Sequence, residues 1–247
     1  MEKIFYYLFY DIQSLRACSL TCHLWCSFAR PLLYFYLTTD RAIFGDKPIE
    51  TQLKDMHKLK LLPFVKQLCI RQTDDFTPKQ LSSFYSRYSE AFKDLQELGI
   101  DHLRVSEFVN KRGFKHFAPI LRFLALKDPR GSSREILYFI GLFPNLQDLK
   151  IHDPVIEEEK ENTANSTLVP PSIPPLRGWL ILAGLTGKLV TDLIALFGKG
   201  SFRHMDLFMV NGAQQLLDWG ANTLETLRLY PTDPYGESLS ERNAEAD

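Results

Sequence analysis

Three of the four cysteines, Cys18, Cys22 and Cys26, stand at a four-residue interval in the stretch LRACSLTCHLWCSFARPLL. Thiolates at such spacing could bind a metal, so a metal or redox centre is the first chemistry to test. Structural zinc sites join one pair of Cys ligands to a second Cys or His pair, and no second pair follows here. Cysteines one turn apart on a helix seldom meet disulfide geometry. We therefore expect reduced thiols and neither a metal nor a cofactor.

Other patterns that indicate catalysis are missing from the sequence. It holds no H-E-x-x-H, no G-x-S-x-G and no P-loop, and its six histidines are scattered. Gly198-Lys199-Gly200 follows a predicted helix and is typical of a helix C-terminus. The glutamates between residues 157 and 161 stand in a polar run that cannot hold or desolvate a carboxylate for acid-base catalysis. The sequence thus predicts a protein that is not an enzyme.

Composition limits the partners further. The chain has 247 residues, a net charge of -1 and a pI near 6.6, which offers no basic field for nucleic acid. The apolar start MEKIFYYLFY is short, is led by Glu2 and Lys3, and lacks a cleavage site, so it does not fit a signal peptide. No stretch approaches the roughly 20 apolar residues of a membrane span. We expect no nucleic-acid or membrane partner and a cytoplasmic or nuclear location.

The cysteine stretch has the periodicity of a helix with two apolar faces. At about 100° per residue, one stripe combines small side chains with a tryptophan: Leu15, Cys18, Cys22, Trp25, Cys26 and Ala29. Free cysteine behaves as a small buried hydrophobe, so this stripe can pack against neighbouring helices. Leu20 and Leu24 fall about 140° and 180° from Leu15. A second apolar face needs either the rest of the chain or a separate protein.

A six-residue pattern, apolar-x-x-apolar-x-apolar, recurs along the chain at intervals of 22 to 30 residues. The hexamers start at Val65, Leu95, Leu121, Leu146, Leu176, Phe202 and Leu224. Each is expected to form a short strand whose first, fourth and sixth side chains enter a core. One strand cannot bury that face alone, so the strands must stack in parallel. The pattern resembles that of leucine-rich repeats, whose unit opens on L-x-x-L-x-L.

Segments with helical periodicity lie between the hexamers, and an order of strand, helix, strand predicts a parallel sheet. The predicted helices span 78–92, 105–117, 133–143, 188–197 and 212–219. Eight residues after each hexamer start, where a leucine-rich repeat has Asn or Cys, other residue types stand. The expected fold is therefore α/β: a short N-terminal helical segment, then an irregular leucine-rich-repeat-like solenoid with a parallel sheet.

The N-terminal stretch resembles the second half of an F-box. The shared pattern is SLxxCSLxCxxW from Ser14, followed by RPLL from Arg30. The preceding EKIFYYLFYDIQSL is similar to the first helix and turn of that motif, with Ile4 and Leu8 at apolar positions. PPLRGWLIL and TLETLRLYPTDPYGE resemble segments of fungal F-box proteins with irregular leucine-rich repeats. An F-box normally opens with Leu-Pro and an acidic residue, whereas this chain begins at Met1, so the resemblance implies an N-terminally truncated F-box.

This resemblance implies a substrate-recognition adaptor of an SCF-type (cullin-RING) ubiquitin ligase. The N-terminal helices would dock the ligase adaptor subunit through Ile4, Leu8, Leu20, Leu24 and Pro31. The repeats would bind a protein substrate. The expected organisation is an F-box-like segment over 1–44 and a leucine-rich-repeat-like domain over 45–236. Composition further predicts a mobile insertion at 154–175 and a disordered tail over 237–247.

Substrate binding is expected on the concave face of the repeat sheet, where the third and fifth hexamer side chains point outward. The candidate residues are Gln67, Glu97, Phe123, Asp148, Lys150, His204, Asp206 and Arg228. Two alternatives to the ligase adaptor stay open. One is a repeat-domain interaction scaffold whose truncated F-box only caps the solenoid, without ligase contact. The other is a metal or redox protein that uses the cysteines.

Overall fold

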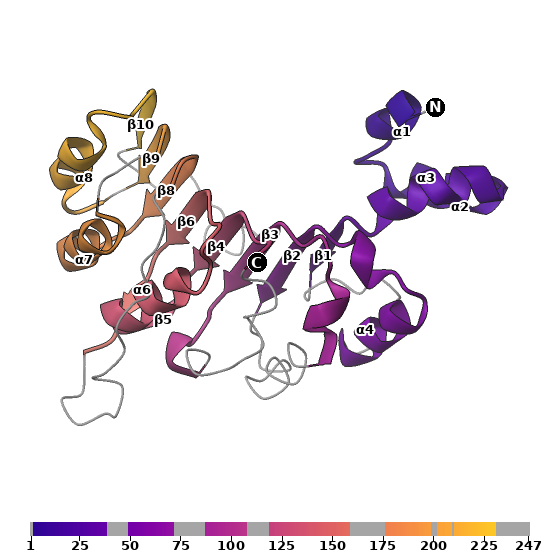
Figure 1. Ribbon diagram of the computed structural model, residues 1–247, viewed down its shortest axis with the longest axis horizontal. Helices are drawn as coiled ribbons and strands as arrows, with labels where there is room; N and C mark the ends of the chain where they lie inside the picture. Colours follow the sequence, from indigo (N-terminus) through magenta and orange to yellow (C-terminus); the bar gives the residue numbers. More distant parts are fainter. Residues whose placement is uncertain are drawn as a thin grey trace, which may run out of the picture. The chain divides into compact units, whose positions relative to one another are not determined.

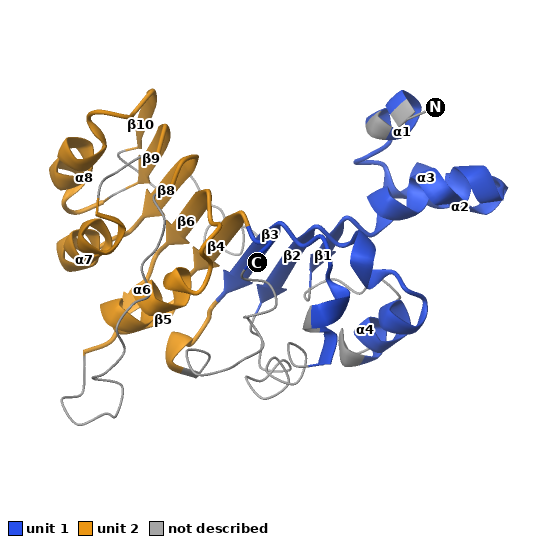
Figure 2. Ribbon diagram, in the orientation of Figure 1, with its two compact units in different colours: residues 1–101, 110–121 blue, residues 102–109, 122–247 orange. Residues whose placement is uncertain are grey.

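The computed structural model describes residues 2–38, 49–71, 87–107, 119–158, 176–198, 202–208 and 210–230. The chain divides into two compact units (Figure 2): unit 1 holds residues 1–101 and 110–121, and unit 2 holds residues 102–109 and 122–247. Each unit contains helices and parallel strands, so the predicted α/β class with a parallel sheet is confirmed. The predicted boundary at residue 44, residues 159–175 of the predicted insertion and the tail over 237–247 lie outside the described residues.

Unit 1 begins with three helices, α1 (Glu2–Tyr7), α2 (Ile12–Thr21) and α3 (His23–Leu33), drawn in indigo in Figure 1. The fully or nearly fully buried side chains of this segment are Phe5, Leu15, Cys18 and Ala29. Half-buried apolar side chains pack around them: Leu8, Trp25, Phe28, Leu32 and Leu33. The predicted N-terminal helical segment is thus present, and it has a small core of its own.

The cysteine stretch forms two helices rather than the single helix that its periodicity predicts. Cys22 lies between α2 and α3 with an extended backbone, φ −162° and ψ 169°. Cys18 is buried, Cys26 is half-buried and Cys22 is exposed, and all three are free thiols. The prediction of one apolar stripe is therefore wrong at Cys22, because the extended residue resets the helical phase.

The sheet strands of unit 1 are β1 (Tyr36–Thr38), β2 (Gln67–Arg71) and β3 (Glu97–Asp101), which pair in parallel in that order. α4 (Ile49–Lys58) and the 3-10 helices η1 (Leu62–Phe64) and η2 (Ser89–Ala91) lie between them in sequence. η2 falls in the described part of the helix predicted over 78–92. Leu68 pairs with Leu98 and Ile70 with Ile100, and all four are buried, as predicted for the fourth and sixth hexamer positions.

The larger sheet strands of unit 2 follow the order β4 (Phe123–Lys127), β6 (Asp148–His152), β8 (Trp179–Ala183), β9 (His204–Phe208) and β10 (Thr226–Tyr230), all parallel. A smaller parallel pair joins β5 (Arg130–Gly131) to β7 (Val155–Ile156). η3 (Val105–Glu107) is the described part of the helix predicted over 105–117.

Helices α6 (Ser133–Gly141), α7 (Gly187–Phe197) and α8 (Ala213–Gly220) confirm the helices predicted over 133–143, 188–197 and 212–219. They lie side by side along one face of the unit 2 sheet (Figure 1). A capping box starts α6, where the Glu135 N–H donates to Ser132 Oγ at 3.2 Å and the Ser132 N–H donates to Glu135 Oε2 at 3.0 Å. Gly198, with φ 66°, ends α7 as predicted. None of the described helices is long and apolar enough to cross a membrane.

A left-handed residue follows four of the strands and carries the chain out of the sheet. These residues are His102, Asp128, Asp153 and Gly184, with φ between 46° and 65°. In unit 2 the N–H of Asp128 donates to the carbonyl of His152 at 2.8 Å, and that of Asp153 donates to Ala183 at 3.0 Å. Gly, Asp and His are among the residues that tolerate this backbone region best. Each turn is therefore hydrogen-bonded to the end of the following strand.

Two hexamers depart from the predicted pattern of burial. In LRGWLI the buried strand residues are Leu180 and Leu182, one position later than predicted, so Trp179 and Ile181 are only half-buried. In the last hexamer, Leu227 and Leu229 are exposed rather than buried. β10 stands at the end of the described strand order, so the core positions of this strand lack a following layer among the described residues.

Candidate functional site

The face of the unit 2 sheet opposite α6, α7 and α8 carries the side chains that alternate with the buried leucines. No helix of the described residues covers this face in Figure 1, and we call it the helix-free face. Six predicted site residues lie on its strands: Phe123, Asp148, Lys150, His204, Asp206 and Arg228. The other two, Gln67 and Glu97, occupy the matching position in unit 1, where they pair in register between β2 and β3. The predicted residues therefore lie on the strands, although Asp206 is buried rather than exposed, and their role in substrate binding stays a prediction.

Two aromatic pairs flank Asp206 on the helix-free face. Asp206 lies on β9 between His204 and Phe208, which are two residues away and share its side of the strand. His204 stacks on Trp179 of β8, with ring centroids 4.6 Å apart. Phe208 stacks on Tyr230 of β10, with centroids 4.2 Å apart and the rings nearly parallel. A carboxylate thus stands between two aromatic walls.

The Asp206 carboxylate is almost completely buried, with 7% of the residue exposed. Its Oδ2 lies 3.9 Å from Arg228 Nη1, which is too long for a hydrogen bond. Its Oδ1 has no hydrogen-bond partner among the described residues, and the same holds for Nδ1 of His204. Arg228 also lies over the ring of Trp179, with its guanidinium carbon 5.5 Å from the centroid. We call this group the Asp206 site: Trp179, His204, Asp206, Phe208, Arg228 and Tyr230.

Sequence reasoning found only three members of the Asp206 site, His204, Asp206 and Arg228. Trp179 was missed because the hexamer at Leu176 is one residue out of register, which assigned the tryptophan to the core. The signal that could have found it is Gly178, which interrupts the hexamer. Phe208 and Tyr230 follow the sixth position of their hexamers, beyond the outward pair that the pattern considers.

Asp148 has a structural task in this sheet. Its Oδ1 accepts a hydrogen bond from the backbone N–H of Trp179 at 2.6 Å. A Cβ on Gly178 would collide with this same carboxylate oxygen. Asp148 therefore holds the start of β8 in place, and its carboxylate is engaged within the fold.

The predicted adaptor-binding residues differ in exposure. Ile4, Leu20 and Leu24 are exposed, with 57%, 86% and 52% of their surface accessible. Leu8 is half-buried against the core of the helical segment, and Pro31 is half-buried within α3. Among the described residues, six of the eleven exposed large apolar side chains fall between residues 4 and 24. Among the described residues, exposed apolar surface is thus concentrated on the N-terminal helical segment.

A group of acidic and imidazole side chains that the sequence analysis did not identify lies where β4 and β6 end. One ligand atom each of Asp128, His152 and Asp153 lie within 4.8 Å of one another. Nδ1 of His152 is 3.0 Å from Asp153 Oδ2, and Nδ1 of His102 is 3.3 Å from Asp128 Oδ2. Carboxylate oxygens with an imidazole nitrogen could ligate a divalent cation. The same groups also contact one another in the turns that follow the strands.

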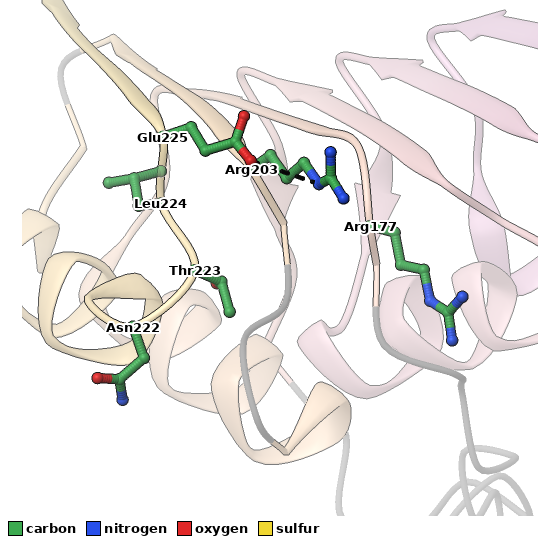
Figure 3. Close-up of a pocket in the computed structure, with 6 residues that line it drawn as sticks. All are labelled: Arg177, Arg203, Asn222, Thr223, Leu224 and Glu225. Carbon is green, nitrogen blue, oxygen red and sulfur yellow. Dashed lines mark ion pairs between the residues drawn. The ribbon is translucent and has the colours of Figure 1, made fainter.

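A cavity of about 600 Å³ opens where β9 and β10 begin (Figure 3). It is lined by Arg177, Arg203, Asn222, Thr223, Leu224 and Glu225. Arg203 Nε lies 3.6 Å from Glu225 Oε1, whereas Arg177 points away from that pair in Figure 3. The six lining residues include no nucleophile paired with a base, so the cavity supports no catalytic constellation.

Comparison of the chain with protein-family models, with curated proteins and with solved structures found no match.

Proposed function

We propose that this protein is a non-enzymatic substrate-recognition adaptor of an SCF-type ubiquitin ligase. The N-terminal helices dock the ligase adaptor subunit, and the strands of an irregular leucine-rich-repeat solenoid bind a protein substrate. The observation that carries the proposal is the exposed apolar surface of α1 to α3, on helices whose opposite sides already share a core. The resemblance of the same residues to an F-box indicates that the partner is the ligase adaptor subunit.

The exposure of Leu20 and Leu24 supports docking, because a bound partner would bury their apolar surface and so gain hydrophobic free energy. Leu20 precedes and Leu24 follows the extended Cys22, so they present apolar surface from both helices beside the break. Leu15 and Ala29, in contrast, are fully buried and stabilise the segment itself. Exposed apolar side chains grouped on one segment are typical of a protein-binding surface.

The regular spacing of the unit 2 strands supports the solenoid part of the proposal. The fourth position of successive hexamers forms a row of buried side chains across β4, β6 and β9, namely Leu124, Leu149 and Met205, with Leu180 of β8 completing it. Left-handed turns recur after β4, β6 and β8 in the same relation to the next strand. Repeat proteins use the face of such a sheet to bind extended partners.

Co-purification tests the docking proposal. The chain and its Leu20→Asp plus Leu24→Asp variant are each mixed with the ligase adaptor subunit, and retention on the chain is measured. We expect wild type to retain the adaptor and the double variant to lose at least about 90% of it, because two charges replace buried interface contacts. Leu59→Asp is the matched control, since Leu59 is 59% exposed in the same unit, and it should retain the adaptor.

Circular dichroism of all three proteins verifies that the helices persist. If wild type fails to retain the adaptor, the ligase role is overturned. If the double variant retains as much as wild type, Leu20 and Leu24 are not the contact.

One observation favours the second candidate, an interaction scaffold whose helical segment only caps the sheet. α3 leads within three residues into β1, the first strand in the order, and it also contacts η1. The backbone carbonyl of Phe35 accepts hydrogen bonds from Lys66 and Gln67, which ties this connection to β2. Failure to retain the adaptor, together with intact folding, would favour the scaffold.

A further inference from the structure

We infer that the Asp206 site binds the guanidinium group of an arginine side chain on a protein partner. The inference rests on the proposed function, in which a protein substrate binds the helix-free face. It adds that this face recognises an arginine side chain of that substrate. The site brings together a buried carboxylate, two stacked aromatic pairs and an exposed arginine of the chain itself.

The Asp206 carboxylate supplies the charge for this recognition. It is buried at 7% exposure, and its Oδ1 lacks a hydrogen-bond donor among the described residues. A buried carboxylate is stable only when donors satisfy its oxygens, and a guanidinium offers five N–H donors in a planar fork. When the exposed Arg228 side chain moves aside, an arginine of the partner would donate to Oδ1 and Oδ2 together.

The aromatic pairs supply shape and further attraction. The His204–Trp179 stack and the Phe208–Tyr230 stack stand on either side of Asp206 along β9. A planar guanidinium stacks on such rings, and the faces of Trp and Tyr attract a cation. A compact ammonium group would use less of the two walls, which favours arginine as the occupant.

Arg228 shows that the site accommodates a guanidinium. Its side chain lies over Trp179 and reaches toward Asp206, yet the 3.9 Å separation leaves the ion pair without a hydrogen bond. The side chain is 53% exposed, so it can move aside at little cost. We take Arg228 to be the occupant of the site in the absence of a partner, which an incoming arginine displaces.

Nα-acetyl-arginine amide is the probe that tests the inference on the full chain, with Nα-acetyl-citrulline amide as its neutral isostere. Binding is followed by the NMR signal of the Trp179 indole N–H, assigned with Trp179→Phe. The arginine probe should shift this signal saturably, and the citrulline probe should not. Asp206→Asn preserves shape and should weaken binding at least about tenfold, because the ion pair is lost. Arg228→Met should bind more tightly than wild type, since the competing guanidinium is removed.

Asp218→Asn is the matched control, because Asp218 is an exposed carboxylate on α8 of the same unit and lies outside the Asp206 site, and it should bind as wild type does. The inference is overturned if wild type gives no saturable shift, if citrulline binds equally, or if Asp206→Asn keeps full affinity. It is equally overturned if Arg228→Met binds no better than wild type. The titration contains no ligase adaptor, so failure of adaptor docking and failure of arginine binding are distinguished by separate measurements.

Discussion

Gly178 determines which residues of β8 face the core of the unit 2 sheet. Its carbonyl accepts hydrogen bonds from the N–H groups of both Arg203 and His204, at 3.1 and 3.3 Å. The equivalent carbonyl at the start of β4, two strands earlier in the order, belongs to Arg122, which accepts from the N–H groups of Gln147 and Asp148. Arg122 is the second residue of its hexamer and Gly178 is the third, so β8 begins one residue late. This shift moves Trp179 out of the core and beside His204.

Gly178→Ala should lower the free energy of unfolding by about 1–3 kcal/mol, the usual cost of overpacking. The added Cβ would collide with the Asp148 carboxylate, which must then release the backbone N–H of Trp179. In an Asp148→Ala background the same substitution should cost at least about 1 kcal/mol less, because the colliding group is gone. Urea unfolding of the four proteins in this cycle measures both numbers.

Gly187→Ala is the control for that cycle, since a Cβ there meets nothing closer than an atom 4.0 Å away. It should leave stability unchanged or slightly raised, because alanine restricts the unfolded chain and favours a helix. Equal losses for Gly178→Ala with and without Asp148 would contradict the proposed collision.

At the scale of elements, the break between α2 and α3 creates two helix starts, and each needs its own N-terminal cap. Asp11 caps α2: its Oδ1 accepts from the Ser14 N–H at 3.0 Å and its Oδ2 accepts from the Ser14 hydroxyl at 2.6 Å. Cys22, at the start of α3, makes no side-chain cap hydrogen bond. Side-chain hydrogen bonds therefore stabilise the start of α2, the helix that carries Leu20, but not the start of α3.

Hydrogen bonds from the Ser14 hydroxyl, and then from its N–H, hold the pKa of Asp11 below its ordinary value of 3.8. A carboxyl whose pKa is lowered by folding stabilises the folded state above its unfolded pKa, and this stabilisation is lost as the pH falls through the folded pKa. Asp11→Ala should thus lower the melting temperature at pH 7, and its difference from wild type should shrink from about pH 5 downward.

Thermal melting followed by circular dichroism at pH 7, 5 and 3 measures the melting temperatures of both proteins. Carboxylates that the two proteins share titrate in both, so their effect cancels in the difference. Asp11→Asn is the control, because asparagine also caps a helix but does not titrate. A difference between wild type and Asp11→Ala that stays constant over this pH range would argue against the charged cap.

At the scale of the whole molecule, the sequence predicted what depends on periodic burial. The hexamers located β2, β3, β4, β6, β8, β9 and β10, and apolar spacing located α6, α7 and α8, because a buried face must repeat with its element. β1, β5 and β7 match no hexamer, and β7 lies within the insertion predicted over 154–175. Two local events could not be predicted this way. The extended backbone of Cys22 and the late start of β8 each change which residues face the core. Neither change is visible in the order of apolar and polar residue types. Trp179 was missing from the predicted site because of the late start of β8, whereas Phe208 and Tyr230 were missed because they follow the sixth position of their hexamers.

The last strand differs from the others in how its core positions are covered. Leu207 on β9 is 3% exposed, whereas Leu229, its partner in register on β10, is 57% exposed, and Leu227 is also exposed. β10 stands at one end of the strand order, so a row of apolar side chains accompanies a strand edge among the described residues. Such edges promote association between chains.

Leu227→Lys plus Leu229→Lys should therefore reduce concentration-dependent association, measured by light scattering, because lysine on an edge strand opposes pairing. The free energy of unfolding should stay within about 0.5 kcal/mol of wild type, as for exposed sites generally. Leu207→Lys is the matched comparison on β9 and should cost several times more, about 3 kcal/mol or above, since it places a charge in the core. If the double variant unfolded as readily as Leu207→Lys, the two leucines would have to be buried in the protein in solution, and β10 would then be an internal strand.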